Sequence, residues 1–106
     1  MSEWVDVAGV GDFETGCAIV VDVDGAMIGV FRLEDGFYAI EDVCTHDGGD
    51  LVGGCVQGDE VICPRHGAHF SIRTGKALSA PAYEDVPTFP VRIENGRVQV
   101  RDDRWD

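Results

Sequence analysis

The segments that decide how this 106-residue chain folds are two short motifs, Cys44-Thr45-His46 and Cys63-Pro64-Arg65-His66. Each motif supplies one thiolate and one imidazole, and sixteen residues separate the two motifs. A zinc finger of the common type has its cysteines first and its histidines later. Two mixed pairs suit a two-iron cluster instead, with one iron bound by sulfur and the other by nitrogen. The candidate metal ligands are therefore Cys44, His46, Cys63 and His66.

Glycine follows each ligand pair, at Gly48 and Gly49 in the first loop and at Gly67 in the second. Backbone N–H groups must come close to the sulfides of an iron–sulfur cluster. Only glycine lets a chain turn that tightly without side-chain clashes. The glycines therefore support a cluster site built from two loops.

The whole pattern resembles the Rieske [2Fe–2S] proteins, over a region from about Val5 to Val100. The stretch Val61–Ala77 is similar to the second cluster loop and following hairpin of small Rieske-type ferredoxins, which serve bacterial ring-hydroxylating dioxygenases. The resemblance implies one [2Fe–2S] cluster per chain. Its ligands would be Cys44 and Cys63 on one iron, and His46 and His66 on the other.

The resemblance also implies an electron carrier rather than an enzyme. Such a carrier receives electrons from an NAD(P)H-dependent flavoprotein ferredoxin reductase and passes them singly to a terminal Rieske non-haem iron oxygenase. No general base, nucleophile or substrate pocket can be identified in the sequence. Two other functions stay open: the small subunit of an assimilatory nitrite reductase, a group that has often lost its ligands, and a zinc-bound structural or interaction module.

Short apolar runs alternate with turn signals, which predicts an all-β chain with one domain over residues 1–106. The pair Asn95-Gly96 is the strongest two-residue hairpin signal. The resemblance implies small stacked antiparallel sheets with a cluster-binding tip formed by the two loops, and a third loop, with Pro81, that covers the cluster. The expected strands are 17–23, 26–33, 37–41, 60–62, 90–94 and 97–101.

The chain is strongly acidic, with 20 acidic and 8 basic residues and a net charge of −12. Nucleic-acid phosphates would repel such a surface, so we expect no nucleic-acid partner. No apolar run is long enough to span a membrane and no signal peptide is recognised, so we expect a cytoplasmic protein without a disulfide framework. The acidic residues serve solubility or steer the chain to basic partner surfaces.

Several residues differ from those of the high-potential Rieske proteins. Gly49 and Arg65 replace the cysteines of a disulfide clamp, and Ala68 and Phe70 replace a serine and a tyrosine whose hydroxyls bond to cluster sulfurs. Without these donors the reduced cluster is less stabilised. We therefore expect a potential at the low end of the family range.

The remaining candidates have simpler interpretations. His69 is not expected to be a ligand, because the four-ligand set is already complete. Cys17 and Cys55 are expected to be small buried thiols. The loop acids Asp42, Asp47 and Asp50 are expected to be solvated, although they could border the exposed histidines and shape docking.

Overall fold

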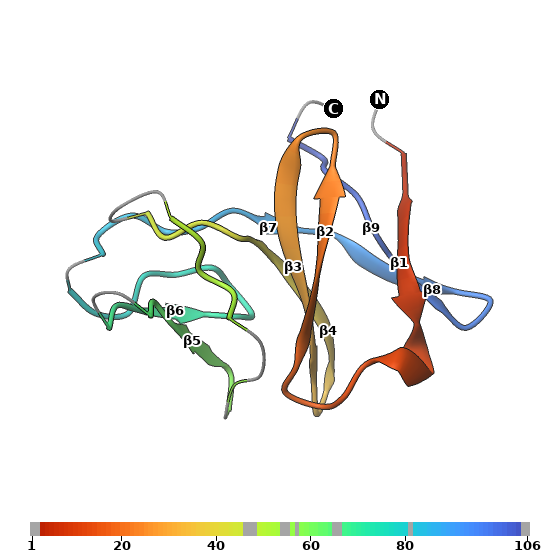
Figure 1. Cartoon of the computed structure of the whole chain (residues 1–106), viewed down its shortest axis with the longest axis horizontal. Helices are drawn as coiled ribbons and strands as arrows, with labels where there is room; N and C mark the ends of the chain where they lie inside the picture. The colour runs from red at the N-terminus through yellow and green to blue at the C-terminus, as the bar shows by residue number, and fades with distance from the viewer. Residues whose placement is uncertain are drawn as a thin grey trace.

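The computed structural model describes residues 3–45, 49–53, 56, 58–64, 67–80 and 82–104. Those residues form β-strands and one short 3-10 helix, which confirms the all-β class. No helix among them is long and apolar enough to cross a membrane. In chain order (Figure 1), the elements are β1 (Val5–Gly9), η1 (Val10–Asp12), β2 (Ala18–Val23), β3 (Ala26–Leu33), β4 (Gly36–Glu41), β5 (Glu60–Ile62), β6 (His69–Ser71), β7 (Thr88–Phe89), β8 (Val91–Glu94) and β9 (Arg97–Val100).

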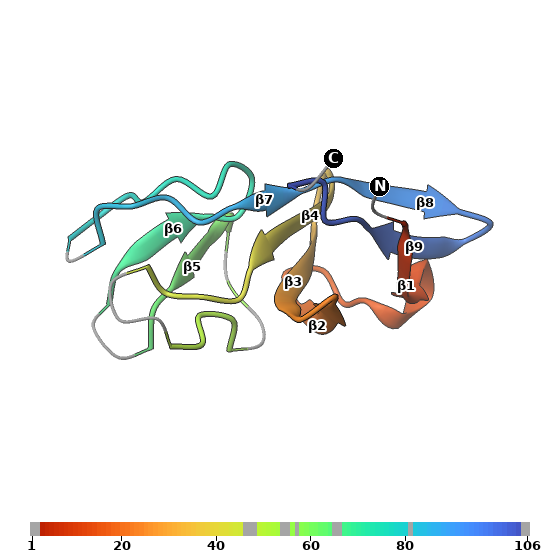
Figure 2. The same cartoon turned by 90° about the horizontal axis from the view of Figure 1, so that it is seen from above.

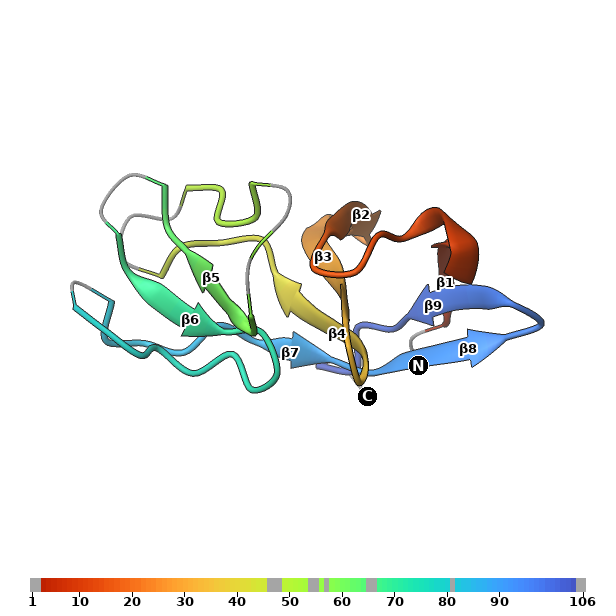
Figure 3. The same cartoon turned by 90° about the horizontal axis from the view of Figure 1, so that it is seen from below.

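The strands form three antiparallel sheets, in the orders β1-β9-β8, β2-β3-β4-β7 and β5-β6. Figures 2 and 3 show the four-stranded sheet in the middle of the molecule, with the three-stranded sheet at one end and the β5–β6 hairpin at the other. We call the described residues between β4 and β7 the small lobe. Sheets and loops are thus arranged as the resemblance implies.

Strand β3 is apolar on both faces, and this places it at the centre of the molecule. Successive side chains of a strand point to opposite faces. Ile28 and Val30 belong to one buried cluster, the sandwich core, while Phe31 and Leu33 belong to another, the small-lobe core. The sandwich core comprises Phe13, Val23, Ile28, Val30, Ala39, Phe89, Val98 and Val100. The small-lobe core comprises Phe31, Leu33, Ile40, Cys44, Leu51, Val61, Cys63, Ala68, Phe70, Ile72, Ala82 and Val86.

Gly29 lets the small lobe approach β3 closely. A Cβ atom at this position would lie 2.6 Å from Cγ2 of Val52, a separation at which one of the two atoms must move. The segment around Val52 therefore rests directly on the backbone of β3. This contact fixes the height of the first ligand loop above the sheet.

The β8–β9 hairpin turns at Asn95-Gly96, as predicted. Both residues have positive φ angles, of 52° and 75°, which is the requirement of a type I′ turn. β9 also pairs with β1 in the register Val5↔Val100, so the first and last strands of the chain are neighbours.

Arg73 joins the small lobe to the β3–β4 hairpin. Its guanidinium lies 3.1 Å from Asp35 and 3.6 Å from Asp59, and its Cζ lies 5.6 Å from the ring centre of Tyr38. All the charged groups are partly exposed, so these ion pairs orient the lobe more than they stabilise it.

The structure differs from expectation at Cys17, which is disulfide-bonded rather than a buried thiol. The expectation of a chain without disulfides is therefore wrong at this residue. The preceding residue, Gly16, accepts a hydrogen bond of 2.7 Å from the N–H of Val56, so the start of β2 lies against the loop that precedes β5. Cys55 lies outside the described residues.

A buried carboxylate closes the C-terminal end of the described chain. Asp102 is 3% exposed, and its two oxygens accept hydrogen bonds of 3.0 and 2.9 Å from Nε and Nη2 of Arg104. The same guanidinium reaches Glu41 at 3.4 Å and lies over the ring of Phe89. Hydrogen bonds from Arg104 lower the pKa of Asp102 from its ordinary 3.8, and they outweigh burial, which would raise it.

We predict that Asp102→Asn lowers the free energy of unfolding at pH 7 by about 1–2 kcal/mol, the contribution of charge-assisted hydrogen bonds to a partly exposed arginine. The pKa of Asp102 is lower in the folded protein than its unfolded value of 3.8. Ionised Asp102 therefore stabilises the fold fully above pH 3.8, and this stabilisation is lost as the pH falls through the folded-state pKa. The difference in the free energy of unfolding between wild type and Asp102→Asn should therefore become smaller at acidic pH. Urea unfolding of wild type, Asp102→Asn and the exposed control Asp103→Asn measures this, and an equal loss in both variants would contradict it.

Candidate metal centre

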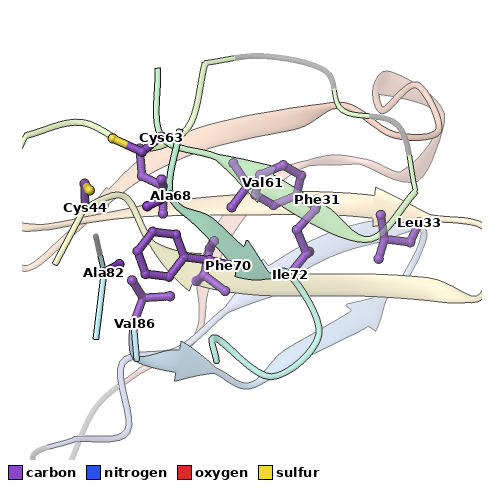
Figure 4. Packing of buried hydrophobic residues seen from close by; sticks show 12 residues of the cluster. Phe31, Leu33, Cys44, Val61, Cys63, Ala68, Phe70, Ile72, Ala82 and Val86 are labelled. Atoms are coloured by element: carbon purple, nitrogen blue, oxygen red, sulfur yellow. The ribbon is translucent and has the colours of Figure 1, made fainter. Parts of the chain in front are cut away.

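Two of the four predicted ligands, Cys44 and Cys63, lie together in the small-lobe core. Cys44 follows β4 and Cys63 follows β5, and the two side chains are 0% and 1% exposed. Figure 4 shows both sulfur atoms at the same end of this core, near Ala82 and far from Leu33. Neither of these two cysteines forms a disulfide. Two thiols that meet from separate loops fit the sulfur-bound side of a two-iron cluster.

His46 and His66, the two predicted nitrogen ligands, lie outside the described residues, as do Asp47 and Arg65. Their neighbours Thr45 and Gly67 are described. The nearest described residues after His46 and before His66 are Gly49 and Pro64.

The first ligand loop is closed by its own backbone and by Asp42. The N–H of Cys44 donates to the carbonyl of Gly49 at 2.8 Å. Oδ1 of Asp42 accepts from the N–H groups of Leu51 and Val52, at 2.8 and 2.7 Å. One carboxylate oxygen thus joins the chain before the loop to the chain after it. Asp42 is a half-buried structural residue, which corrects the expectation of a solvated loop acid.

The second ligand loop is a tight reversal between β5 and β6. The N–H of Cys63 donates to the carbonyl of Ala68 at 2.8 Å, and the N–H of Gly67 donates to the carbonyl of Cys63 at 3.0 Å. Gly67 has a φ of +73°, a conformation that glycine adopts readily and that other residues rarely do. The tight turn expected at this glycine is present, and its role in bringing backbone N–H groups to the cluster sulfides stays a prediction.

A third segment packs against the first loop, and we call residues 77–86 the cover segment. Oγ1 of Thr45 donates to the carbonyl of Glu84 at 2.6 Å. Oδ1 of Asp85 accepts from the N–H of Ala77 at 2.9 Å, which holds the two ends of the segment together. Ala82 is buried in the same core as the two cysteines. Pro81, expected to stiffen this segment, lies outside the described residues.

His69 lies on β6, with Nδ1 3.0 Å from Oε1 of Glu60. It stands opposite Ile62 in the β5–β6 ladder, and Ile62 is 51% exposed. Its neighbour Phe70 points the other way, into the small-lobe core. The imidazole therefore lies on the outer face of the hairpin, paired with a carboxylate.

The surroundings of the two thiols are apolar. Leu51, Ala68 and Phe70 share their core and are at most 1% exposed. Such a wall excludes water from the sulfur side of a bound cluster, and it places no side-chain hydroxyl at positions 68 and 70. The residues present thus fit an iron–sulfur centre of low potential.

The comparison with known protein families agrees with this geometry. The model of the Rieske [2Fe–2S] domain matches residues 3–90 of the chain. The chain belongs to the Rieske [2Fe–2S] domain family. A [2Fe–2S] cluster is therefore its cofactor, and the interpretation as a zinc-bound module falls away.

Similar proteins and structures are ferredoxins of dioxygenase systems. The ferredoxin component of the naphthalene 1,2-dioxygenase/salicylate 5-hydroxylase systems of Ralstonia sp is 38% identical, over 92% of this chain and 94% of that protein. The ferredoxin component of the naphthalene 1,2-dioxygenase system of Pseudomonas putida is 35% identical over the same shares. A solved complex of reduced oxygenase and oxidized ferredoxin in carbazole 1,9a-dioxygenase contains a similar chain. That chain is 37% identical to this one, with a TM-score of 0.85, and the match covers 92% of this chain and 91% of that chain.

We predict that adding a hydroxyl donor beside the thiols raises the reduction potential. The wild-type midpoint should lie near the bottom of the Rieske range, at about −150 mV. Phe70→Tyr supplies a donor that favours the extra negative charge of the reduced state. A gain of about 1.4 kcal/mol corresponds to roughly 60 mV for one electron.

Protein-film voltammetry of Phe70→Tyr and Phe70→Leu tests this prediction. The leucine variant changes the packing without adding a donor, so its potential should not rise. A wild-type midpoint well above zero, or an equal rise in both variants, would show that other contacts set the potential.

We also predict that Asp42→Ala impairs retention of the cluster, because it leaves two N–H groups at the base of the first loop without their acceptor. Asp42→Asn keeps an oxygen that can accept both bonds and should retain the cluster. Iron and acid-labile sulfide per chain, measured after anaerobic purification, compare the two variants. Equal retention in both would contradict the clamp role.

Proposed function

We propose that this chain is an electron-carrying ferredoxin of a ring-hydroxylating dioxygenase system. The observation that carries the proposal is the convergence of Cys44 and Cys63 in a Rieske domain whose relatives are dioxygenase ferredoxins over nearly their full length. We further propose that residues 1–106 form one such domain. In the cytoplasm, where NAD(P)H is available, it would accept electrons from a flavoprotein reductase and deliver them to a terminal Rieske non-haem iron oxygenase.

The proposed ligand set is Cys44 and Cys63 for one iron, and His46 and His66 for the other. When bound, the cluster takes up and releases one electron at a time. The chain's own residues do the rest. The backbone bonds of Cys44 and Cys63 set the spacing of the loops, and the apolar core keeps water from the thiolates. The cover segment closes the third side through Thr45.

Residues beside the ligands position the loops rather than react. No proton or substrate atom has to be bound for electron transfer. A rigid scaffold serves this role, because a site that changes little between redox states needs little reorganisation. The two loops are fixed at both ends by backbone hydrogen bonds of 2.8 to 3.0 Å.

A nitrite reductase small subunit is the second candidate. A solved chain described as a putative NADH-dependent nitrite reductase small subunit from Mycobacterium tuberculosis has a TM-score of 0.79 and 26% identity to this chain. Its identity is lower than the 35 to 38% of the dioxygenase ferredoxins. All four candidate ligands are present here, which favours the electron carrier.

We predict two irons and two acid-labile sulfides per chain after anaerobic purification, and a reduced-state EPR spectrum of low average g. Cys63→Ser should abolish the spectrum, because serine offers a harder and more basic oxygen ligand. The reduced wild-type protein should be oxidised by the oxygenase component of carbazole 1,9a-dioxygenase or of naphthalene 1,2-dioxygenase in stopped-flow experiments. Stoichiometric zinc without sulfide, or a loaded protein that is oxidised by neither oxygenase, would refute the proposal.

A further inference from the structure

Tyr83 is the most exposed large apolar side chain among the described residues. It is 85% exposed, compared with 55% for Ile93 and 46% for Leu78. Tyrosine usually buries most of its ring when it serves folding, and this ring contributes to neither core. Its role therefore has to be sought outside the fold.

The backbone on both sides of Tyr83 is fixed to the metal centre. The preceding residue, Ala82, is 4% exposed and packs in the small-lobe core with Cys44. The carbonyl of the following residue, Glu84, accepts the 2.6 Å hydrogen bond from Thr45, which stands between two of the proposed ligands. Two anchored neighbours therefore hold the backbone of Tyr83 beside the first ligand motif, while its ring is exposed.

The next turn of the cover segment is fixed as well. Asp85 accepts from the N–H of Ala77, and the N–H of Val86 donates to the carbonyl of Gly75 at 2.8 Å. A tyrosine on a rigid base has only two side-chain torsions left to order. It therefore loses little entropy when a partner covers it.

Along the sequence, the charged residues nearest to Tyr83 are negative. Glu84 and Asp85 are exposed, and residues 78–86 contain no lysine or arginine. The chain as a whole has a net charge of −12. A surface that covers this aromatic ring therefore needs an apolar recess with a basic rim.

From these contacts we infer that Tyr83 is the anchor with which this protein docks on its oxygenase, its ring entering an apolar recess bordered by basic residues. The inference rests on the proposed function. The oxygenase is the partner class, because a chain 37% identical to this one belongs to a solved complex of oxygenase and ferredoxin. Aromatic side chains at the centre of an interface commonly dominate its binding energy, whereas rim charges mainly affect association rates.

Tyr83→Ala, Tyr83→Phe and Ile93→Ala test the inference. Ile93 is exposed on β8, at the opposite end of the molecule from the small lobe, and serves as the matched control (Figure 2). The measurement is the second-order rate at which the oxygenase component of carbazole 1,9a-dioxygenase oxidises each reduced, cluster-loaded variant. We expect at least a tenfold loss for Tyr83→Ala and less than a twofold change for the other two. The ratio of Tyr83→Ala to wild type should stay constant with ionic strength, while the wild-type rate falls.

The visible spectrum, the midpoint potential and the rate of oxidation by ferricyanide show whether the centre itself has changed. A rate for Tyr83→Ala equal to wild type would overturn the inference and leave the proposed function standing. The inference also fails if the loss is the same with ferricyanide, or if only reduction by a flavoprotein reductase is slowed. A wild-type protein that reacts with ferricyanide but not with the oxygenase would count against the proposed function instead.

Discussion

The burial of β3 on both faces is the constraint on which the rest of the molecule depends. One face supplies Ile28 and Val30 to the sandwich core, and the other supplies Phe31 and Leu33 to the small-lobe core. The sheet is therefore a shared wall, and neither half of the molecule can bury its apolar residues without it. The first ligand loop packs on this wall through Val52, and Gly29 allows their close approach.

The small lobe relies on backbone geometry more than on regular structure. β5 and β6 have three residues each, too few for a stable isolated hairpin. The apolar face of this hairpin packs against the four-stranded sheet and against the cover segment. The cysteines take part in that core, so loading of the metal centre and folding of the lobe are linked.

Local patterns in the sequence predicted much of this fold. The bounds of 26–33 and 60–62 agree with β3 and β5, because turn residues mark both ends of these strands. The two-residue β7 was not predicted, since it exists only through long-range pairing with β4.

The hydrogen bonds that Asp42 accepts and the bond from Thr45 to Glu84 were not predicted either. Their partners lie up to 39 residues away, and no local signal identifies them. The exposure of the Tyr83 side chain was not predicted either, because only the packing of the folded chain shows which side of the cover segment faces solvent.

The pairing of β1 with β9 has a consequence for the chain's connectivity. Val5 and Val100 stand opposite each other in one ladder, in the sheet farthest from the ligand loops (Figure 2). A short linker could therefore join the two ends, and new ends could be opened at the exposed Asn95-Gly96 turn. A chain permuted in this way would keep both ligand motifs in one continuous stretch. Its new ends would lie at the far end of the molecule from the small lobe, which would allow attachment to an electrode with the metal centre left facing outward.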